Sequence, residues 1–125
     1  MTPTPHTDRF APPSDDDART LRRAASLIDA FRSVDPAIPS AYIAAFLAVA
    51  AQPGLGVTEY AERLGMIRPV CSRVLLEIGV KTRTGGPGYG LVDRMHSTVD
   101  MRAVNYYLTP KGRRLLAQVL KHMEV

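Results

Sequence analysis

The stretch VTEYAERLGMIRPVCSRVLLEIG, residues 57–79, decides the fold of this chain. Apolar residues recur at helical spacing in its first half, and Gly65 directly follows the last of them. A glycine at that point can adopt the left-handed backbone that ends a helix. Pro69 stands near the start of a second apolar stripe, where its missing N–H costs nothing because first-turn donors have no helical partner. We therefore predict a helix-turn-helix.

The second predicted helix presents two different faces. Its apolar face consists of Cys71, Val74, Leu75 and Ile78. A helical wheel at about 100° per residue places on or beside the opposite face Pro69, Val70, Ser72, Arg73 and Glu77. A helix with a buried apolar stripe and an outward Ser and Arg fits the major groove of duplex DNA. Arg73 is therefore expected to contact DNA, with a surface ion pair to Glu77 as the alternative, and Arg68 is expected to contact phosphate.

Basic residues are concentrated in and after the helix-turn-helix. The net charge is +4, and Lys and Arg outnumber Asp and Glu by ten to three between Arg63 and Arg114. Such a concentration is typical of a surface that binds phosphate groups, although a charge that only aids solubility would look the same. Lys81, Arg83 and Arg94 are predicted either to contact phosphate or simply to solvate a loop.

The remaining chemistry of the sequence argues against several classes of protein. Cys71 is the single cysteine, which rules out an intramolecular disulfide, and its place on the apolar face predicts a buried thiol rather than a redox sensor. His6, His96 and His122 are scattered, so we predict no metal site. The glycine-rich TGGPGYG lacks the ending of a nucleotide-binding loop. No nucleophile has a plausible base, so we predict no catalytic residue, no cofactor and no enzyme activity.

Length and hydropathy predict one domain that does not cross a membrane. A chain of 125 residues suits a single core. Residues 1–13 are rich in proline and polar groups and lack the apolar segment of a secretory signal, so we expect a disordered tail before a single domain over residues 14–125. The longest apolar run, residues 42–51, is too short to span a bilayer.

Two helices are predicted at the ends of this domain. Ser14 and the three aspartates after it begin a helix within residues 14–35, because a hydroxyl caps the first turn and carboxylates suit its positive end. Thr109 and a following proline begin the last helix, residues 110–125. We expect both helices to form a dimerisation layer. The last helix has three cations in its first turn, Lys111, Arg113 and Arg114, where the dipole disfavours them, so an anionic partner is predicted nearby, with solvation as the alternative.

Between these ends, residues 38–109 are predicted to form the DNA-binding lobe. After a mostly apolar support helix and the helix-turn-helix, residues 79–90 contain too much glycine for regular structure and predict a flexible link. Residues 91–95 and 103–108 read as two strands around a polar hairpin tip, and residues 55–58 could add a third. The expected fold is mostly α (α+β): a winged helix-turn-helix with a two- to three-stranded wing sheet and a terminal dimerisation layer.

These residues resemble the MarR family of bacterial winged-helix transcription regulators, in a short form. The resemblance runs from about Ile38 to Leu116, and four pieces carry it: VTEYAERLGMIRPVCSR, GLVDR at 90–94, DMR at 100–102 and LTPKGR at 108–113. It implies a homodimer that places two recognition helices in successive major grooves and two wings against the flanking minor grooves. One departure is Ile67, which stands where the family often has a Ser-like helix cap.

The resemblance also implies roles for individual residues. Ser72 and Arg73 match the residues of the recognition helix that read bases. Arg102 matches the wing arginine that enters the minor groove, and Asp100 matches the acid that braces it. The physics agrees, because a planar, always charged guanidinium gains from the negative potential of a narrow minor groove. The alternative for Arg102 is that it is only a solvated charge at the hairpin tip.

Together these patterns predict a cytoplasmic, nucleoid-associated bacterial protein that binds double-stranded DNA as a homodimer and represses transcription by steric blocking. Whether a small-molecule effector controls it stays open. One alternative is a winged helix used as a protein-interaction module, which would bind DNA weakly and without preference. Another is a replication or partition factor of a mobile element, which would bind iterated sites.

Overall fold

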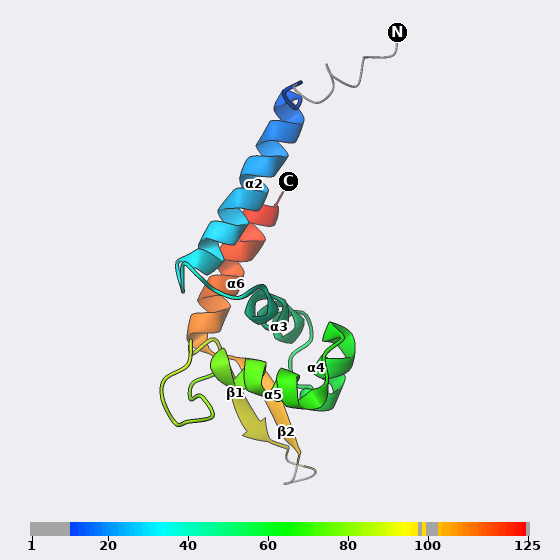
Figure 1. Cartoon of the computed structure of the whole chain (residues 1–125), viewed down its shortest axis with the longest axis vertical. Helices are drawn as coiled ribbons and strands as arrows, with labels where there is room; N and C mark the ends of the chain where they lie inside the picture. The colour runs from blue at the N-terminus through cyan, green and yellow to red at the C-terminus, as the bar shows by residue number, and fades with distance from the viewer. Residues whose placement is uncertain (1–10, 98, 100–102, 125) are drawn as a thin grey trace.

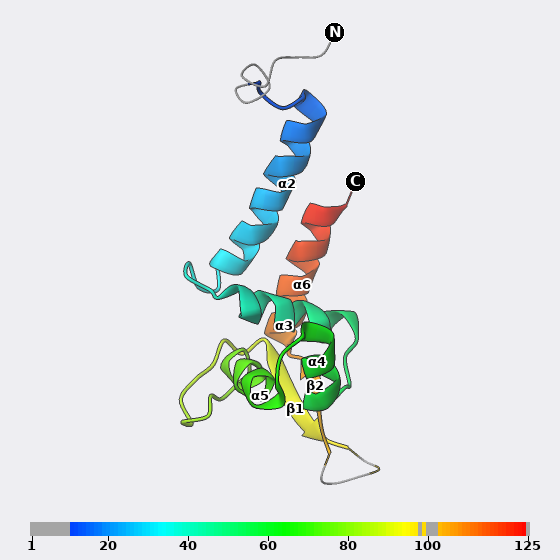
Figure 2. The same ribbon diagram turned by 45° about the vertical axis from the view of Figure 1, so that its right-hand side comes forward.

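The structure, a computed structural model, describes residues 11–97, 99 and 103–124. Its elements, in chain order, are α2 (Asp15–Arg32), α3 (Ser40–Ala51), α4 (Val57–Leu64), α5 (Arg68–Glu77), β1 (Val92–His96), β2 (Val104–Leu108) and α6 (Pro110–Met123). Helices α2 and α6 lie side by side along the long axis of the molecule, and the other elements form a lobe at one end (Figures 1 and 2). This arrangement is the predicted mostly-α winged helix-turn-helix.

The outer helices, α2 and α6, begin at the residues where side-chain caps were predicted. The Ser14 hydroxyl accepts a hydrogen bond from the Asp17 backbone N–H at 3.1 Å. The Thr109 hydroxyl accepts one from the Gly112 N–H at 3.0 Å. Each hydroxyl therefore satisfies a first-turn donor that the helix itself leaves without a partner. Helix α5 differs, because Ile67 precedes it and offers no side-chain cap.

The turn of the helix-turn-helix is made by Gly65. Helix α4 ends there, with a φ of 65° and a ψ of 30° at the glycine. A left-handed backbone of this kind strains any residue that carries a Cβ, which is why a glycine occupies the position. The Met66 N–H then donates to the Ala61 carbonyl at 3.0 Å, and the chain turns toward α5. The predicted turn is confirmed.

Helix α3 is the support around which the lobe packs. It contacts α4, α5 and β2. The Phe46 ring meets the Phe31 ring of α2 edge-on at 5.7 Å, and the Tyr60 ring of α4 meets the Tyr106 ring of β2 at 6.4 Å. All four aromatic rings are buried, and the Tyr60 hydroxyl donates to the Gln52 carbonyl at 2.7 Å. One core therefore ties the lobe to the end of α2.

Cys71 lies in this core with no exposed surface, as predicted. Burial raises the pKa of its thiol, because the thiolate would lose its hydration. We expect a thiol reagent to modify native protein at least about 100-fold more slowly than unfolded protein, since modification requires opening of the core. Following the reaction with a chromogenic disulfide in buffer and in denaturant measures this ratio, and equal rates would place Cys71 at the surface.

The wing sheet contains two antiparallel strands among the described residues. Val92 of β1 pairs with Leu108 of β2, and the pairing runs to His96 and Val104. Residues 55–58, considered as a third strand, form no strand: Gly54 and Leu55 make two backbone hydrogen bonds to Tyr106, and α4 begins at Val57. Gly54 N–H donates to the Tyr106 carbonyl at 2.8 Å, and Tyr106 N–H donates to the Leu55 carbonyl at 3.0 Å.

Residues 79–90 form a compact loop without regular helix or strand, as their glycine content predicted. The loop is irregular, but its backbone is hydrogen-bonded along its length: Gly88 N–H donates to the Val80 carbonyl at 3.2 Å, and Gly90 N–H donates to the Gly79 carbonyl at 2.9 Å. A Cβ on Gly88 would overlap the Gly79 carbonyl and lie 2.8 Å from the Glu77 oxygen. Gly79 and Gly88 therefore allow the backbone of the loop to pack closely.

Candidate nucleic-acid interface

Helix α5 has the two faces that were predicted for a recognition helix. Cys71, Val74 and Leu75 are buried. Arg68, Pro69 and Arg73 are exposed, and Val70 and Ser72 are partly exposed. The buried side anchors the helix on α3 and α4, so that the opposite side stands at the surface of the lobe (Figure 2).

Arg68, the first residue of α5, lies on the side of the helix-turn-helix that faces the wing. It lines one shallow hollow with Val57, Pro69 and Ser72, and a neighbouring hollow with residues at the start of β2, among them Asn105. The first-turn N–H groups of α5 have no side-chain cap, so the positive end of the helix dipole faces the same region. A guanidinium beside such a helix end is suited to an oxygen anion such as a backbone phosphate.

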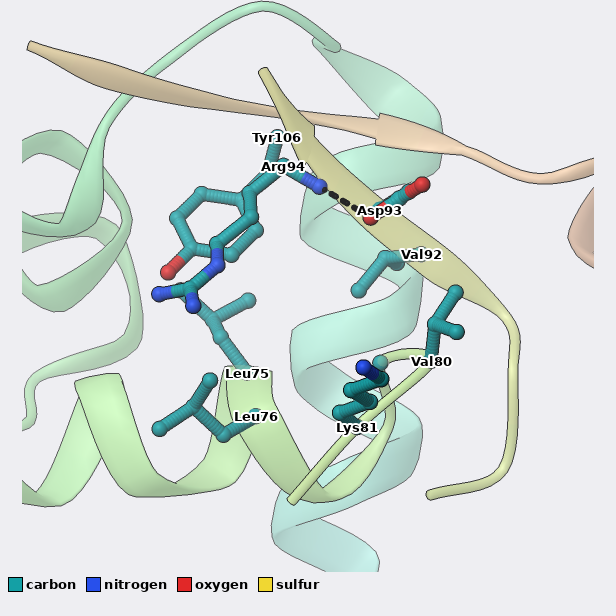
Figure 3. Close-up of a pocket in the computed structure, with 9 residues that line it drawn as sticks. Leu75, Leu76, Val80, Lys81, Val92, Asp93, Arg94 and Tyr106 are labelled. Carbon is teal, nitrogen blue, oxygen red and sulfur yellow. Dashed lines mark hydrogen bonds between the residues drawn. The ribbon is translucent and has the colours of Figure 1, made fainter. Parts of the chain in front are cut away.

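Arg94 lies at the far end of α5, on β1. Its guanidinium lies beside the Tyr106 ring and close to Leu75 and Leu76, and Lys81 stands on the other side of the same small cavity (Figure 3). The cavity measures about 190 Å³. Arg94 and Lys81 are exposed, so both extend the positive surface beyond the C-terminal end of the recognition helix.

Sequence reasoning missed Leu76. It follows Arg73 by three residues, so it belongs to the outward face of α5, and it is only partly buried. The loop residues Val80 and Lys81 lie beside it in the cavity of Figure 3. A helical wheel places Leu76 on the outward face, so its position could have been predicted from the sequence. It was not selected because an apolar side chain gives no chemical reason to expect a contact with DNA.

The wing-tip residues Asp100 and Arg102 lie outside the described residues. At the end of the paired strands, the Ser97 N–H donates to the Ala103 carbonyl at 2.9 Å. Arg83 is described and is exposed in the turn at residues 82–86.

The basic first turn of α6 has a different explanation from the predicted anionic partner. The Lys111 ammonium donates to the Tyr89 carbonyl at 2.8 Å, and the Arg113 guanidinium donates to the Leu108 carbonyl at 3.2 Å. These cations therefore bind backbone carbonyl oxygens of the segments that precede the helix. Arg114 is exposed and lines a hollow with Ser33 at the base of α2.

Two properties of the described part of the chain bear on other functions. Over these residues, no group of three or more His, Cys, Asp or Glu side chains could hold a metal ion. No described helix is both long enough and apolar enough to cross a membrane.

Comparison with known proteins identifies the fold. No protein-family model matches the sequence, and no curated protein matches it. A mutant of MepR from S. aureus, bound to an oligodeoxyribonucleotide, aligns with a TM-score of 0.65 at 18% identity, over 97% of this chain and 78% of that one. The transcriptional repressor CouR, bound to a 23-mer DNA duplex, aligns with a TM-score of 0.57 at 25% identity, over 98% and 80% of the two chains.

A third solved structure carries the family name. A MarR-family transcriptional regulator from Silicibacter pomeroyi aligns with a TM-score of 0.53 at 22% identity, over 86% of this chain and 65% of that one. The element order, the left-handed turn and the two-stranded wing define a winged helix-turn-helix protein. Within that class, the chain has the fold of the MarR-family regulators, which confirms the resemblance of its sequence.

Proposed function

We propose that the chain binds specific sequences in double-stranded DNA as a homodimer and regulates transcription as a repressor that occupies a promoter. The observation that carries the proposal is the exposed face of α5, where Ser72 and Arg73 stand opposite a buried apolar face. Two structural neighbours, CouR and MepR, are bound to DNA in their structures, which supports duplex DNA as the partner. The protein would act in the cytoplasm, associated with the nucleoid, by steric blocking and without chemistry.

Phosphate contacts would supply most of the binding energy in this proposal. Arg68, Arg83 and Arg94 would contact the backbone, while Pro69, Val70, Ser72 and Arg73 would approach base edges in the major groove. Asp100 and Arg102 are proposed for the minor groove on the basis of the resemblance. Because phosphate contacts release condensed counterions, affinity should fall steeply with salt.

The dimer part of the proposal rests on apolar side chains along the outer helices. Residues 14–35 and 110–125 would form the dimerisation layer, with residues 38–109 as the DNA-binding lobe. Large apolar side chains are exposed along both helices: Leu21, Ile28, Leu120 and Met123. An exposed apolar stripe of this kind marks an interaction site in a soluble protein. A second copy is the occupant expected, because a symmetric dimer presents the same stripe twice and brings two recognition helices to one duplex.

Leu21→Lys is expected to convert the dimer into a monomer, because an ammonium group would have to be buried at the interface. Met95→Lys is the matched control, since Met95 is equally exposed, at 61%, but lies on the wing. Sedimentation velocity at tens of micromolar measures the outcome. A wild-type monomer, or a dimer that survives Leu21→Lys, would remove the proposed dimerisation layer.

Selection of binding sites from a random duplex pool tests the function itself. Enrichment of one inverted repeat, with half-sites about one helical turn apart, is the expected result. Tandem direct repeats would instead favour a replication or partition factor of a mobile element. No enrichment, with weak affinity for every duplex, would favour the protein-interaction module.

A further inference from the structure

Tyr89 contacts three helices, α3, α5 and α6, and the link between α2 and α3. Its ring meets the Tyr42 ring of α3 at 5.8 Å, at an angle of 61°. Its hydroxyl donates to the carboxylate of Asp35, in the link between α2 and α3. Its backbone N–H donates to the Glu77 carbonyl at 3.0 Å, at the last turn of α5, and its carbonyl accepts from the Lys111 ammonium of α6 at 2.8 Å. Tyr89 therefore contacts the recognition helix and also the points where α2 and α6 meet the lobe.

The backbone on each side of Tyr89 is held in place. Gly88 packs against Gly79, at a distance that leaves no room for a Cβ. Gly90 has a φ of 72°, and its carbonyl accepts a hydrogen bond from the Thr109 hydroxyl at 2.5 Å. The Tyr89 side chain therefore extends from a fixed point, and its hydroxyl can transmit the position of Asp35 to the end of α5.

The Asp35 carboxylate is equally fixed. One of its oxygens accepts the Ala37 N–H at 2.9 Å, and the other accepts the Tyr89 hydroxyl. The hydrogen bond from Tyr89 lowers the pKa of Asp35, and the same bond raises the pKa of Tyr89 to about 12. At neutral pH, the hydrogen bond therefore joins a neutral donor to a charged acceptor. Such a bond is stronger than one between two neutral groups.

We propose that Tyr89 is a positioning residue that fixes the orientation of α5 relative to α2, and thereby fixes the half-site spacing that the dimer accepts. This inference rests on the proposed DNA-binding function. Helix α2 would lie at the dimer axis, while α5 would enter the groove. The distance between the two recognition helices therefore depends on how rigidly each lobe is attached to its own α2. The core contact of Phe31 with Phe46 attaches the lobe to the end of α2, and the Tyr89–Asp35 bond adds a second point of attachment at the side of the lobe where α5 ends.

A series of duplexes tests the proposal. In each duplex the spacing between the selected half-sites is changed by one base pair in either direction, and affinity is measured for wild type, Tyr89→Phe and Asp35→Asn. We expect wild type to prefer one spacing, and we expect each variant to lose about fivefold of that discrimination, as for one hydrogen bond of ordinary strength at a partly exposed site. The double variant should lose no more than either single variant, because both remove the same bond.

Tyr42→Phe is the matched control. It keeps the ring that packs on Tyr89 and removes a hydroxyl for which no hydrogen bond is described. The spacing preference of this variant should equal that of wild type. A uniform loss of affinity at every spacing in Tyr89→Phe would show a merely structural role, and an unchanged preference would also overturn the proposal.

A second measurement needs no DNA. Spin labels on Arg22→Cys and Arg73→Cys report the distance between α2 and α5, and the buried Cys71 does not compete for the label. Tyr89→Phe should broaden the distance distribution, whereas Tyr42→Phe should leave it narrow. An equally narrow distribution in Tyr89→Phe would overturn the inference. If wild type selects no duplex, the proposed function fails with the spacing claim, and the label distances alone decide whether Tyr89 positions α5.

Discussion

Arg73→Ala is expected to weaken binding to the selected duplex by about 10- to 100-fold, equivalent to about 1–3 kcal/mol. Arg73 is exposed on the outward face of α5. Its guanidinium carries two parallel donors, and these match the two acceptors of a guanine in the major groove. The loss should be largest for the selected sequence and small for a scrambled duplex, because non-specific binding depends on phosphate contacts. Fluorescence anisotropy with both duplexes at one salt concentration measures the two losses.

Arg19→Ala is the control for this experiment. It removes the same charge from the exposed surface of α2, where Arg19 forms an exposed ion pair with Asp16 at 3.4 Å. Exposed pairs of this kind contribute little to stability, and α2 lies away from the recognition helix (Figure 1). Affinity should therefore stay within about twofold of wild type. Equal losses in Arg19→Ala and Arg73→Ala would mean that net charge, and not the face of α5, determines binding.

Gly112→Ala is expected to lower the free energy of unfolding by about 2–3 kcal/mol. Gly112 is buried in the first turn of α6, and an added Cβ would overlap the Leu91 carbonyl oxygen and lie 3.1 Å from its carbon. These atoms are backbone, so the clash can be relieved only by moving α6 away from the start of the wing. Alanine favours helix by about 1 kcal/mol over glycine, which offsets part of the cost. Urea unfolding followed by circular dichroism measures the change.

Gly86→Ala is the matched control for Gly112→Ala. The nearest atom to an added Cβ at Gly86 is the Thr82 hydroxyl oxygen at 3.6 Å, an ordinary contact. The free energy of unfolding should change by no more than about 0.5 kcal/mol. Gly112→Ala protein with wild-type stability would contradict the close packing of α6 on Leu91.

Local chemistry explains why much of the fold could be predicted from the sequence. Ser14, Gly65 and Thr109 act through hydrogen bonds and backbone angles within a few residues of their own positions, and the structure places each where it was expected. The two faces of α5 follow from helical periodicity in the same way. Short-range rules of this kind need no knowledge of what lies across the molecule.

The roles of glycines and basic side chains were harder to predict from the sequence, because these roles depend on partners far away in the chain. Gly88 packs against Gly79, and the two positions are joined by a loop that reads as flexible in the sequence. Lys111 donates to a carbonyl 22 residues earlier in the chain, although its place in the first turn of a helix suggested an anion. Tyr89 offered no local signal at all, since its partners Asp35 and Tyr42 lie in other elements.

Methylation interference on the selected duplex tests the central claim most directly, because guanine N7 is exposed in the major groove. The proposal predicts two symmetric clusters of interfering guanines about 10 base pairs apart, one for each recognition helix of the dimer. The cluster pattern should be lost with Arg73→Ala. A single cluster, or binding that methylation does not affect, would contradict the placement of two α5 helices in successive major grooves.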